Sequence, residues 1–307
     1  MQAIWTSMSG SVEAGLLYAL MALGVYITFR ILDFPDLTVD GSFTTGGAIA
    51  AVMINAGYSP WLATAAALAG GLVAGSLTGL LHAKGKINGL LSGILMMIAL
   101  YSINLRILGR PNMSLLGMDT IFPPIERDRR WMLLIVIAVV IVVIKLLIDA
   151  FLKTDLGLAL RATGDNAKMI GSFGANTDTT KIIGVSLSNG LVALSGAVIA
   201  MQQGFADISM GIGMIVIGLA SVIIGEALFG AKTVFRATLA VVLGSIVYRI
   251  VVALALRVDW LESSDVKLIT AVIVIIALVV PTASRSWTMK KQAYKRSREL
   301  AGSEAGR

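Results

Sequence analysis

Three carboxylates open one of the apolar stretches of the chain. Residues 33–47 read DFPDLTVDGSFTTGG and place Asp33, Asp36 and Asp40 within eight positions, although only 14% of the chain is charged and 57% is hydrophobic. Carboxylates at a helix N-terminus accept free backbone N–H groups and oppose the positive end of the helix dipole. Pro35 suits a first helical turn because it lacks an N–H group. We therefore expect Asp33 and Asp36 to cap a helix at the cytoplasmic interface, where both are partly hydrated.

Asp40 lies one helical turn deeper than Asp36 and is harder to assign to capping. Ionisable residues inside a membrane usually face the bundle interior or an aqueous path, so Asp40 can line the route of a solute and attract a cationic group on it, such as an ammonium group. A gate, or a contact that changes during transport, is the alternative role. Polar side chains of membrane helices more often hold helices together than bind a solute. The candidate pathway residues are Asp40, Ser42, Thr44, Thr45, Asn104, Asn189, Gln203 and Ser209.

Long apolar runs recur along the 307 residues, and the mean hydropathy is +0.86. A membrane-spanning helix needs about 20 apolar residues to cross a hydrocarbon core of about 30 Å. The chain is therefore predicted to be an all-α polytopic membrane protein with about 8–10 transmembrane helices. The nine predicted segments are 11–29, 37–56, 60–81, 89–108, 131–152, 182–203, 211–229, 234–256 and 266–283.

Two of these segments begin with similar sequences. FPDLTVDGSFTTGG starts at Phe34 and FADISMGIGMIVIG starts at Phe205, which suggests an inverted repeat of segments 1–4 against segments 6–9, a signature of transporter folds. Lysines and arginines in the connections and in the tail predict a cytoplasmic C-terminus. The basic cluster ERDRR at 126–130 conflicts with this orientation, because it falls on the outside.

The longest predicted cytoplasmic loop, 153–181, has helical features of its own. Asp165 or Asn166 can cap a short helix, and Gly174 can end it in the left-handed conformation. Met169, Ile170 and Phe173 then share one apolar side. The loop therefore predicts an amphipathic helix lying across the cytoplasmic face.

The same loop carries a specific family resemblance. GLALRATGDNAKMIGSFGANTDTTK, followed by GVSLSNGLVALSGAVIA, resembles the cytoplasmic loop of ABC-importer permeases of the branched-chain amino acid type. The stretch LDFPDLTVDGSFTTGGA is most similar to the branch of that family associated with aromatic amino acids, tryptophan or tyrosine. The residues that carry the loop match are Gly157, Ala159, Arg161, Ala162, Asn166, Ala167, Gly174 and Asn176.

The resemblance implies that 153–181 is a coupling loop whose helix seats in a groove of an ATPase. An interfacial helix without a partner is the alternative. The residues expected in the coupling loop are Gly157, Arg161, Gly164, Asp165, Asn166, Lys168, Met169, Ile170, Phe173 and Gly174.

The lack of cysteine, of a second histidine and of a P-loop sequence argues against several classes of protein. The chain has no cysteine and one histidine, so we expect no metal site, and no catalytic motif is present. No P-loop sequence occurs, so ATP and Mg²⁺ would be bound by a partner ATPase and no cofactor by this chain. We expect one permease domain, 1–284, and a basic cytoplasmic tail, 285–307, that marks orientation rather than nucleic-acid binding.

Together with the resemblance, these features predict the transmembrane subunit of an ATP-driven importer of a small solute of the amino-acid class, with an aromatic amino acid as one candidate, in the bacterial plasma (inner) membrane. The expected partners are a cytoplasmic ABC ATPase, an extracytoplasmic substrate-binding protein and a second permease copy. The alternative is an ion-coupled secondary transporter that works without an ATPase and uses Asp40, Glu226 and Arg249 as ion or proton sites.

Overall fold

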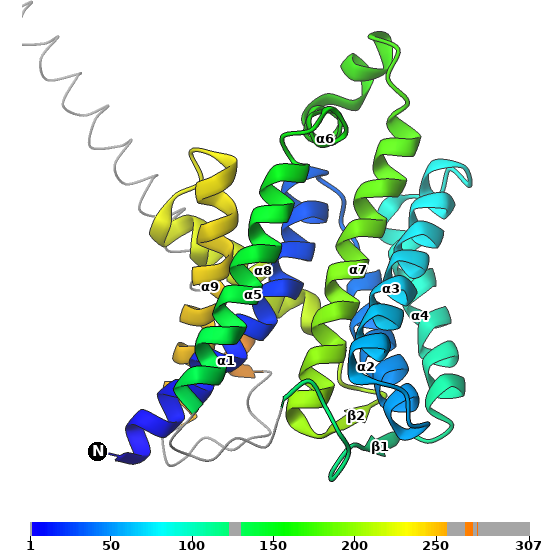
Figure 1. Cartoon of the computed structure of the whole chain (residues 1–307). Coiled ribbons are helices and arrows are strands. Elements are labelled where there is room, and N and C mark those ends of the chain that lie inside the picture. The colour runs from blue at the N-terminus through cyan, green and yellow to red at the C-terminus, as the bar shows by residue number, and fades with distance from the viewer. Residues whose placement is uncertain (1, 123–129, 257–267, 273–274, 276–307) are drawn as a thin grey trace, which may run out of the picture.

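The computed structural model describes residues 2–122, 130–256, 268–272 and 275 and shows a helical bundle (Figure 1). Helix α1 continues directly into a π-helical turn, η1, and two short strands complete the elements. Their bounds are α1 Gln2–Val25, η1 Tyr26–Ile31, α2 Thr38–Asn55, α3 Pro60–Ala83, α4 Gly89–Leu108, β1 Asn112–Ser114, α5 Arg130–Phe151, α6 Asp155–Ser172, α7 Thr177–Gln203, β2 Phe205–Asp207, α8 Met214–Phe229 and α9 Val234–Ala255.

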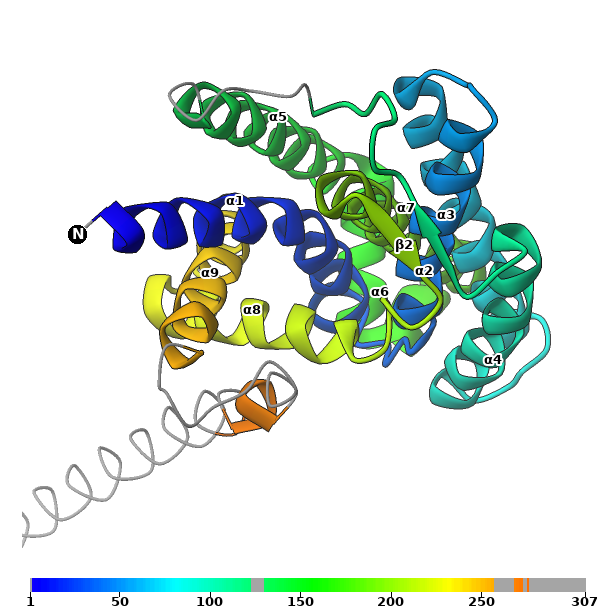
Figure 2. The same cartoon turned by 90° about the horizontal axis from the view of Figure 1, so that it is seen from below.

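The bundle has two distinct ends. Helix α6 and the connections at 84–88 and 230–233 lie at one end, the α6 end, and β1 and β2 lie near the other, the strand end (Figure 1). Strands β1 and β2 pair antiparallel, with Asn112 opposite Asp207. Figure 2 looks at the strand end and shows the helices around the paired strands. The predicted cytoplasmic loop 153–181 lies at the α6 end, together with the connections at 84–88 and 230–233; that this end faces the cytoplasm stays a prediction.

Six of the described helical segments are long and apolar enough to cross a membrane. Helices α2 and α8 have 18 and 16 residues, which correspond to about 27 and 24 Å and fall short of the hydrocarbon core of about 30 Å. The predicted all-α membrane fold is confirmed, and eight of the nine predicted segments are helices. The ninth, 266–283, lies largely outside the described residues, as do the tail 285–307 and residues 126–129 of the basic cluster.

Helix α7 lies against α1, α2 and α3, and glycines bring these backbones close. A Cβ atom at Gly46 of α2 would collide with the backbone of Ala193, and one at Gly75 of α3 would collide with the Val185 carbonyl. Small residues allow this close approach between membrane helices, where packing replaces the hydrophobic effect as the attractive force. These glycines therefore set how closely α2 and α3 pack on α7.

The inverted repeat stays a prediction, although its two motifs fold alike locally. The Thr38 N–H donates to Asp36 Oδ1 at 2.9 Å, and the Ser209 N–H donates to Asp207 Oδ1 at 2.8 Å. Helix α2 starts directly at Thr38, whereas α8 starts later, at Met214. The second motif is therefore followed by an irregular segment, which matters for the pockets described below.

Candidate functional site

The N-terminus of α8 is capped by a side chain from another helix. Gly213 precedes α8 in the left-handed conformation, with φ of 88°, and offers no side-chain cap. The Gly213 N–H donates to Asp40 Oδ2 and the Ile215 N–H donates to Asp40 Oδ1, both at 2.8 Å. The carboxylate thus satisfies two free donors and faces the positive end of the α8 dipole. Asp40 joins α2 to α8.

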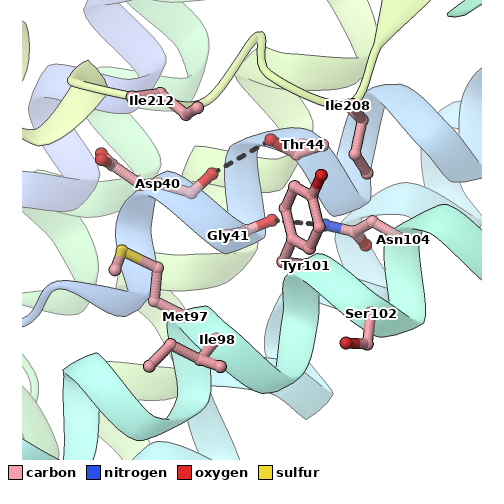
Figure 3. Close-up of a pocket in the computed structure, with 10 residues that line it drawn as sticks. All are labelled: Asp40, Gly41, Thr44, Met97, Ile98, Tyr101, Ser102, Asn104, Ile208 and Ile212. Atoms are coloured by element: carbon pink, nitrogen blue, oxygen red, sulfur yellow. Dashed lines mark hydrogen bonds between the residues drawn. The ribbon is translucent and has the colours of Figure 1, made fainter. Parts of the chain in front are cut away.

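A lateral pocket of about 480 Å³ lies beside this contact (Figure 3). Its volume falls within the range of about 300–1,000 Å³ that is usual for small-molecule sites. Most of the wall is apolar, and Tyr101 contributes an aromatic ring that is 52% exposed. The lining residues are Asp40, Gly41 and Thr44 of α2, Met97, Ile98, Tyr101, Ser102 and Asn104 of α4, and Ile208 and Ile212.

The amide of Asn104 fixes α4 against α2 at this pocket. Asn104 is fully buried; its Nδ2 donates to the Gly41 carbonyl at 3.1 Å, and its Oδ1 accepts from Thr45 Oγ1 at 2.8 Å. Thr44 Oγ1 donates to the Asp40 carbonyl, and Figure 3 draws this bond and the one from Asn104 to Gly41. Asn104 therefore positions the wall, and Thr44 and Asp40 share the pocket with it.

Asp36 and Asn189 lie away from both pockets, and the structure corrects the expected hydration of Asp36. Asp36 is 2% exposed rather than hydrated, because Asn189 Nδ2 donates to Asp36 Oδ2 at 2.6 Å while Thr38 N–H caps the other oxygen. Burial of a carboxylate is tolerated when it is hydrogen-bonded in this way. Asn189 is fully buried and lines neither the lateral pocket nor the strand-end pocket described next. Asp33 is exposed, as expected, with φ of 50°, but it lies five positions before Thr38, the first residue of α2, so the capping expected of it is seen at Asp36 instead.

Gln203 and Ser209 line a second pocket, the strand-end pocket, of about 280 Å³. The eight predicted pathway residues therefore separate: Asp40, Thr44 and Asn104 at the lateral pocket, Gln203 and Ser209 at the strand-end pocket, and Ser42, Thr45 and Asn189 buried between helices. The strand-end pocket is lined by Tyr18, Phe43, Ile199, Gln203, Phe205, Asp207, Ser209, Met210 and Met214. The pathway prediction missed its aromatic residues, although the second Phe-x-Asp motif marks Phe205 and Asp207.

The segment 205–213, which begins with strand β2 and continues irregularly to α8, lies between the two pockets. Ile208 and Ile212 line the lateral pocket, while Ser209 and Met210 line the strand-end pocket. Gly211 fits tightly between them, since a Cβ atom there would collide with the Asp40 carbonyl. The segment is thus a thin partition held against α2.

Replacing Asp40 tests the joint between α2 and α8. In Asp40→Ala, two partly buried N–H groups at the start of α8 lose their acceptor, at a cost of about 1 kcal/mol for each donor, the lower end of the range for fully buried groups. We expect a lower Tm in detergent and slower transport, with Asp40→Asn less affected because its amide oxygen still accepts one bond. Asp119→Ala changes an exposed carboxylate and is the control. A wild-type Tm in Asp40→Ala would contradict this role.

The predicted coupling loop forms α6 and is bent in the middle. Thr154 caps its first part. The helix kinks at Asn166, with φ of −159° and ψ of 89°, and Asn166 Oδ1 accepts the Met169 N–H at 3.0 Å. Gly174 follows in the left-handed conformation, with φ of 85°. The predicted cap at Asn166 and the predicted end at Gly174 are confirmed, while the helix over 155–165 had not been predicted.

Helix α6 is seated on η1 and leaves apolar side chains uncovered. A Cβ atom at Gly164 would collide with the Ile31 carbonyl of η1, so the two backbones touch. Beyond the kink, Met169 is 48% and Phe173 is 80% exposed, and Lys168 is exposed beside them. Large exposed apolar residues rimmed by polar ones are typical of a docking surface.

A polar pocket of about 290 Å³ links α6 to α8 at this end. Arg161 and Asp165 of α6 line it together with an ion pair in which Arg30 Nε lies 3.0 Å from Glu226 Oε1. The other polar lining residues are Tyr26, Lys232 and Thr233. A displacement of α6 would therefore shift η1 and, through the ion pair between Arg30 and Glu226, also α8.

The charged groups considered for an ion-coupled transporter all have structural partners. Asp40 caps α8, Glu226 pairs with Arg30, and the Arg249 guanidinium lies 3.6 Å from the centroid of the Tyr18 ring. Among the described residues, no three histidine, cysteine or acidic side chains come together in a way that could hold a metal ion. The lateral pocket has a volume that can hold a small solute.

Comparison with known proteins gives consistent matches. Residues 7–280 match the family described as branched-chain amino acid transport system / permease component. The chain is 46% identical over 292 residues to a protein of Clostridioides difficile (strain R20291) named tyrosine transport system permease protein. The alignment covers 94% of this chain and 96% of that protein. It is 41% identical over 184 residues to an uncharacterized protein of Rickettsia prowazekii (strain Madrid E), with 60% of this chain and 64% of that protein aligned. No solved structure matches the chain.

Proposed function

We propose that this chain, which belongs to the family of permease components of branched-chain amino acid transport systems, is the membrane-spanning subunit of an ATP-driven ABC importer. The chain is a multi-pass membrane protein and a permease component of an amino acid transport system, so it belongs to a family of transporters and not of enzymes. The resemblance read from its coupling loop is thereby confirmed.

The contact of α6 with η1 and the exposed apolar side chains of α6 carry the proposal. Gly164 brings α6 into backbone contact with η1, while Met169 and Phe173 stay uncovered at the far side of the kink. We assign this surface to a cytoplasmic ABC ATPase, which would bind ATP and Mg²⁺ because this chain has no P-loop sequence. The coupling residues are then those predicted, with Arg161 and Asp165 facing the polar pocket and Lys168, Met169, Ile170 and Phe173 near the partner.

The substrate is proposed to be an amino acid with an aromatic side chain. The name of the Clostridioides difficile relative refers to tyrosine, and the resemblance of residues 32–48 to the aromatic branch supports the same class. The lateral pocket suits such a solute in volume and in its mainly apolar wall with a few polar groups.

Two further partners are proposed, at surfaces other than that of α6. Tyr101 and Ile98 on α4 are 52% and 59% exposed beside the lateral pocket, and a second permease copy on this face would close the pocket into a pathway. An extracytoplasmic binding protein would deliver substrate at the strand end. This orientation places α6 and the basic tail 285–307 in the cytoplasm of a bacterium and the bundle in its plasma (inner) membrane, with 1–284 as one permease domain.

Purification and reconstitution test the proposal. A tagged chain, gently extracted from native membranes, should co-purify with a P-loop ATPase in stoichiometric amount. Liposomes containing this complex should take up labelled tyrosine when ATP and the binding protein are supplied, and should not do so with ADP. A chain that purifies alone and transports under an ion gradient would contradict the proposal and support a secondary transporter.

A further inference from the structure

The strand-end pocket combines an aromatic wall with a carboxylate. Tyr18 and Phe43 form its floor and are 5% and 0% exposed, whereas Phe205 at its mouth is 41% exposed. Met210 and Met214 add adaptable apolar surface. Its volume of about 280 Å³ lies just below the range of about 300–1,000 Å³ that is usual for small-molecule sites, so it suits one amino acid and not a larger solute.

The aromatic floor is held in place before any solute arrives. The Tyr18 and Phe43 rings lie nearly parallel, 10° apart, with centroids 6.0 Å from each other. The guanidinium of Arg249 lies over the Tyr18 ring, an arrangement favoured by the negative face of the ring. A floor that keeps one orientation binds a flat ring at little cost in ordering.

Asp207 brings a negative charge to the same pocket with one oxygen largely free. Its Oδ1 accepts the Ser209 N–H and hydroxyl. Its Oδ2 has only a long contact, 3.4 Å, to Asn112 Nδ2, among the bonds of the described residues. Asp207 is half-buried, so a cation that reaches Oδ2 is only partly screened by water.

We propose that the strand-end pocket is the site that first receives the transported amino acid, with its aromatic ring against Tyr18 and Phe205 and its ammonium group at Asp207 Oδ2. This inference rests on the proposed function and deepens it. The partition 205–213 then separates the receiving site from the lateral pocket, because Ser209 and Met210 line one pocket while Ile208 and Ile212 line the other. The solute passes when the partition moves away from α2.

The absence of cysteine from the chain allows a direct test by single-thiol labelling. Ser209→Cys places one thiol in the pocket, and Ser59→Cys places one at an exposed position at the same end, outside the pocket. The complex with its ATPase, in lipid nanodiscs, is treated with a charged thiol reagent in the presence of three probes. These are L-tyrosine, tyramine, which keeps the ammonium group, and 3-(4-hydroxyphenyl)propionate, which lacks it.

Tyrosine and tyramine should slow labelling of Ser209→Cys about threefold or more, while 3-(4-hydroxyphenyl)propionate should not. None of the three probes should slow labelling of Ser59→Cys. Asp207→Asn, which keeps an oxygen for the Ser209 N–H but loses the charge, should raise the tyramine concentration needed about tenfold. Phe205→Ala should weaken protection by both amines and leave the ammonium preference intact.

The same preparation separates failure of this inference from failure of the proposed function. If ATP-driven tyrosine uptake occurs but tyramine gives no protection at any soluble concentration, the inference is overturned alone. Protection by the propionate equal to that by tyramine, or unchanged protection in Asp207→Asn, also overturns it. Absence of ATP-driven uptake of any aromatic amino acid contradicts the proposed function itself.

Discussion

Asp149→Ala is expected to destabilise the permease strongly, by about 3–5 kcal/mol, because it breaks a buried ion pair. Lys145 and Asp149 lie one turn apart on α5, form an ion pair and are each 3% exposed. Lys145 Nζ also lies 3.2 Å from the centroid of the Phe235 ring, and Thr238 Oγ1 donates to Asp149 Oδ1 at 2.6 Å. The cluster joins α5 to α9.

The reason for the large effect is the charge that remains. Without Asp149, the Lys145 ammonium has no described carboxylate partner, and moving an unpaired charge out of water costs several kcal/mol. Replacing both residues, as in Lys145→Met with Asp149→Leu, removes that penalty, and apolar replacements of a buried pair are often neutral or better. We therefore expect the double variant to be more stable than Asp149→Ala.

Thermal melting in detergent, followed by size-exclusion chromatography, measures the order of stabilities. Asp155→Ala removes an exposed carboxylate close by in the chain and should change the free energy of unfolding by no more than about 0.5 kcal/mol. If Asp149→Ala has the Tm of the wild type, or if the double variant has a lower Tm than Asp149→Ala, the pair does not stabilise the bundle in the way described.

Features that depend on neighbouring residues could be predicted from the sequence. Apolar runs of sufficient length gave eight helices, and the cap at Asn166 and the left-handed Gly174 follow from local rules for helix ends. The Lys145–Asp149 spacing was visible within WMLLIVIAVVIVVIKLLIDAFL, since residues four apart share a helix face. It was missed because the apolar length of this run was the stronger signal.

Features that depend on distant segments could not be predicted. Asp40 was a candidate pathway residue, but its partners Gly213 and Ile215 lie 173 and 175 positions away, and only tertiary packing brings them together. The same holds for Asn189, which appeared polar and functional and instead satisfies the buried Asp36. A single sequence therefore identified the polar residues of α2 and α7 without showing which of them face a pocket.

Gly164→Ala is expected to uncouple transport from ATP hydrolysis while the bundle still folds. An added Cβ atom would collide with the Ile31 carbonyl and press on the Leu32 backbone, so α6 must lift from η1 or tilt. Forcing an extra methyl group into a tight contact costs about 1–3 kcal/mol, equivalent to a 5- to 150-fold change in an equilibrium. We expect ATP-driven uptake to fall about tenfold.

The location of Gly164 gives this prediction a specific signature. Helix α6 contacts the bundle mainly through η1 and α7, so its displacement should alter how the ATPase is held more than it alters Tm. Gly10→Ala is the control, because Gly10 is a helical glycine with open space around it. Arg161→Ala removes an exposed charge from the polar pocket and should lower uptake at an unchanged Tm. Wild-type uptake in both Gly164→Ala and Arg161→Ala would contradict the coupling role of α6. Transport would then tolerate loss of both the backbone contact with η1 and the Arg161 charge, so the ATPase would have to act on the bundle through another element.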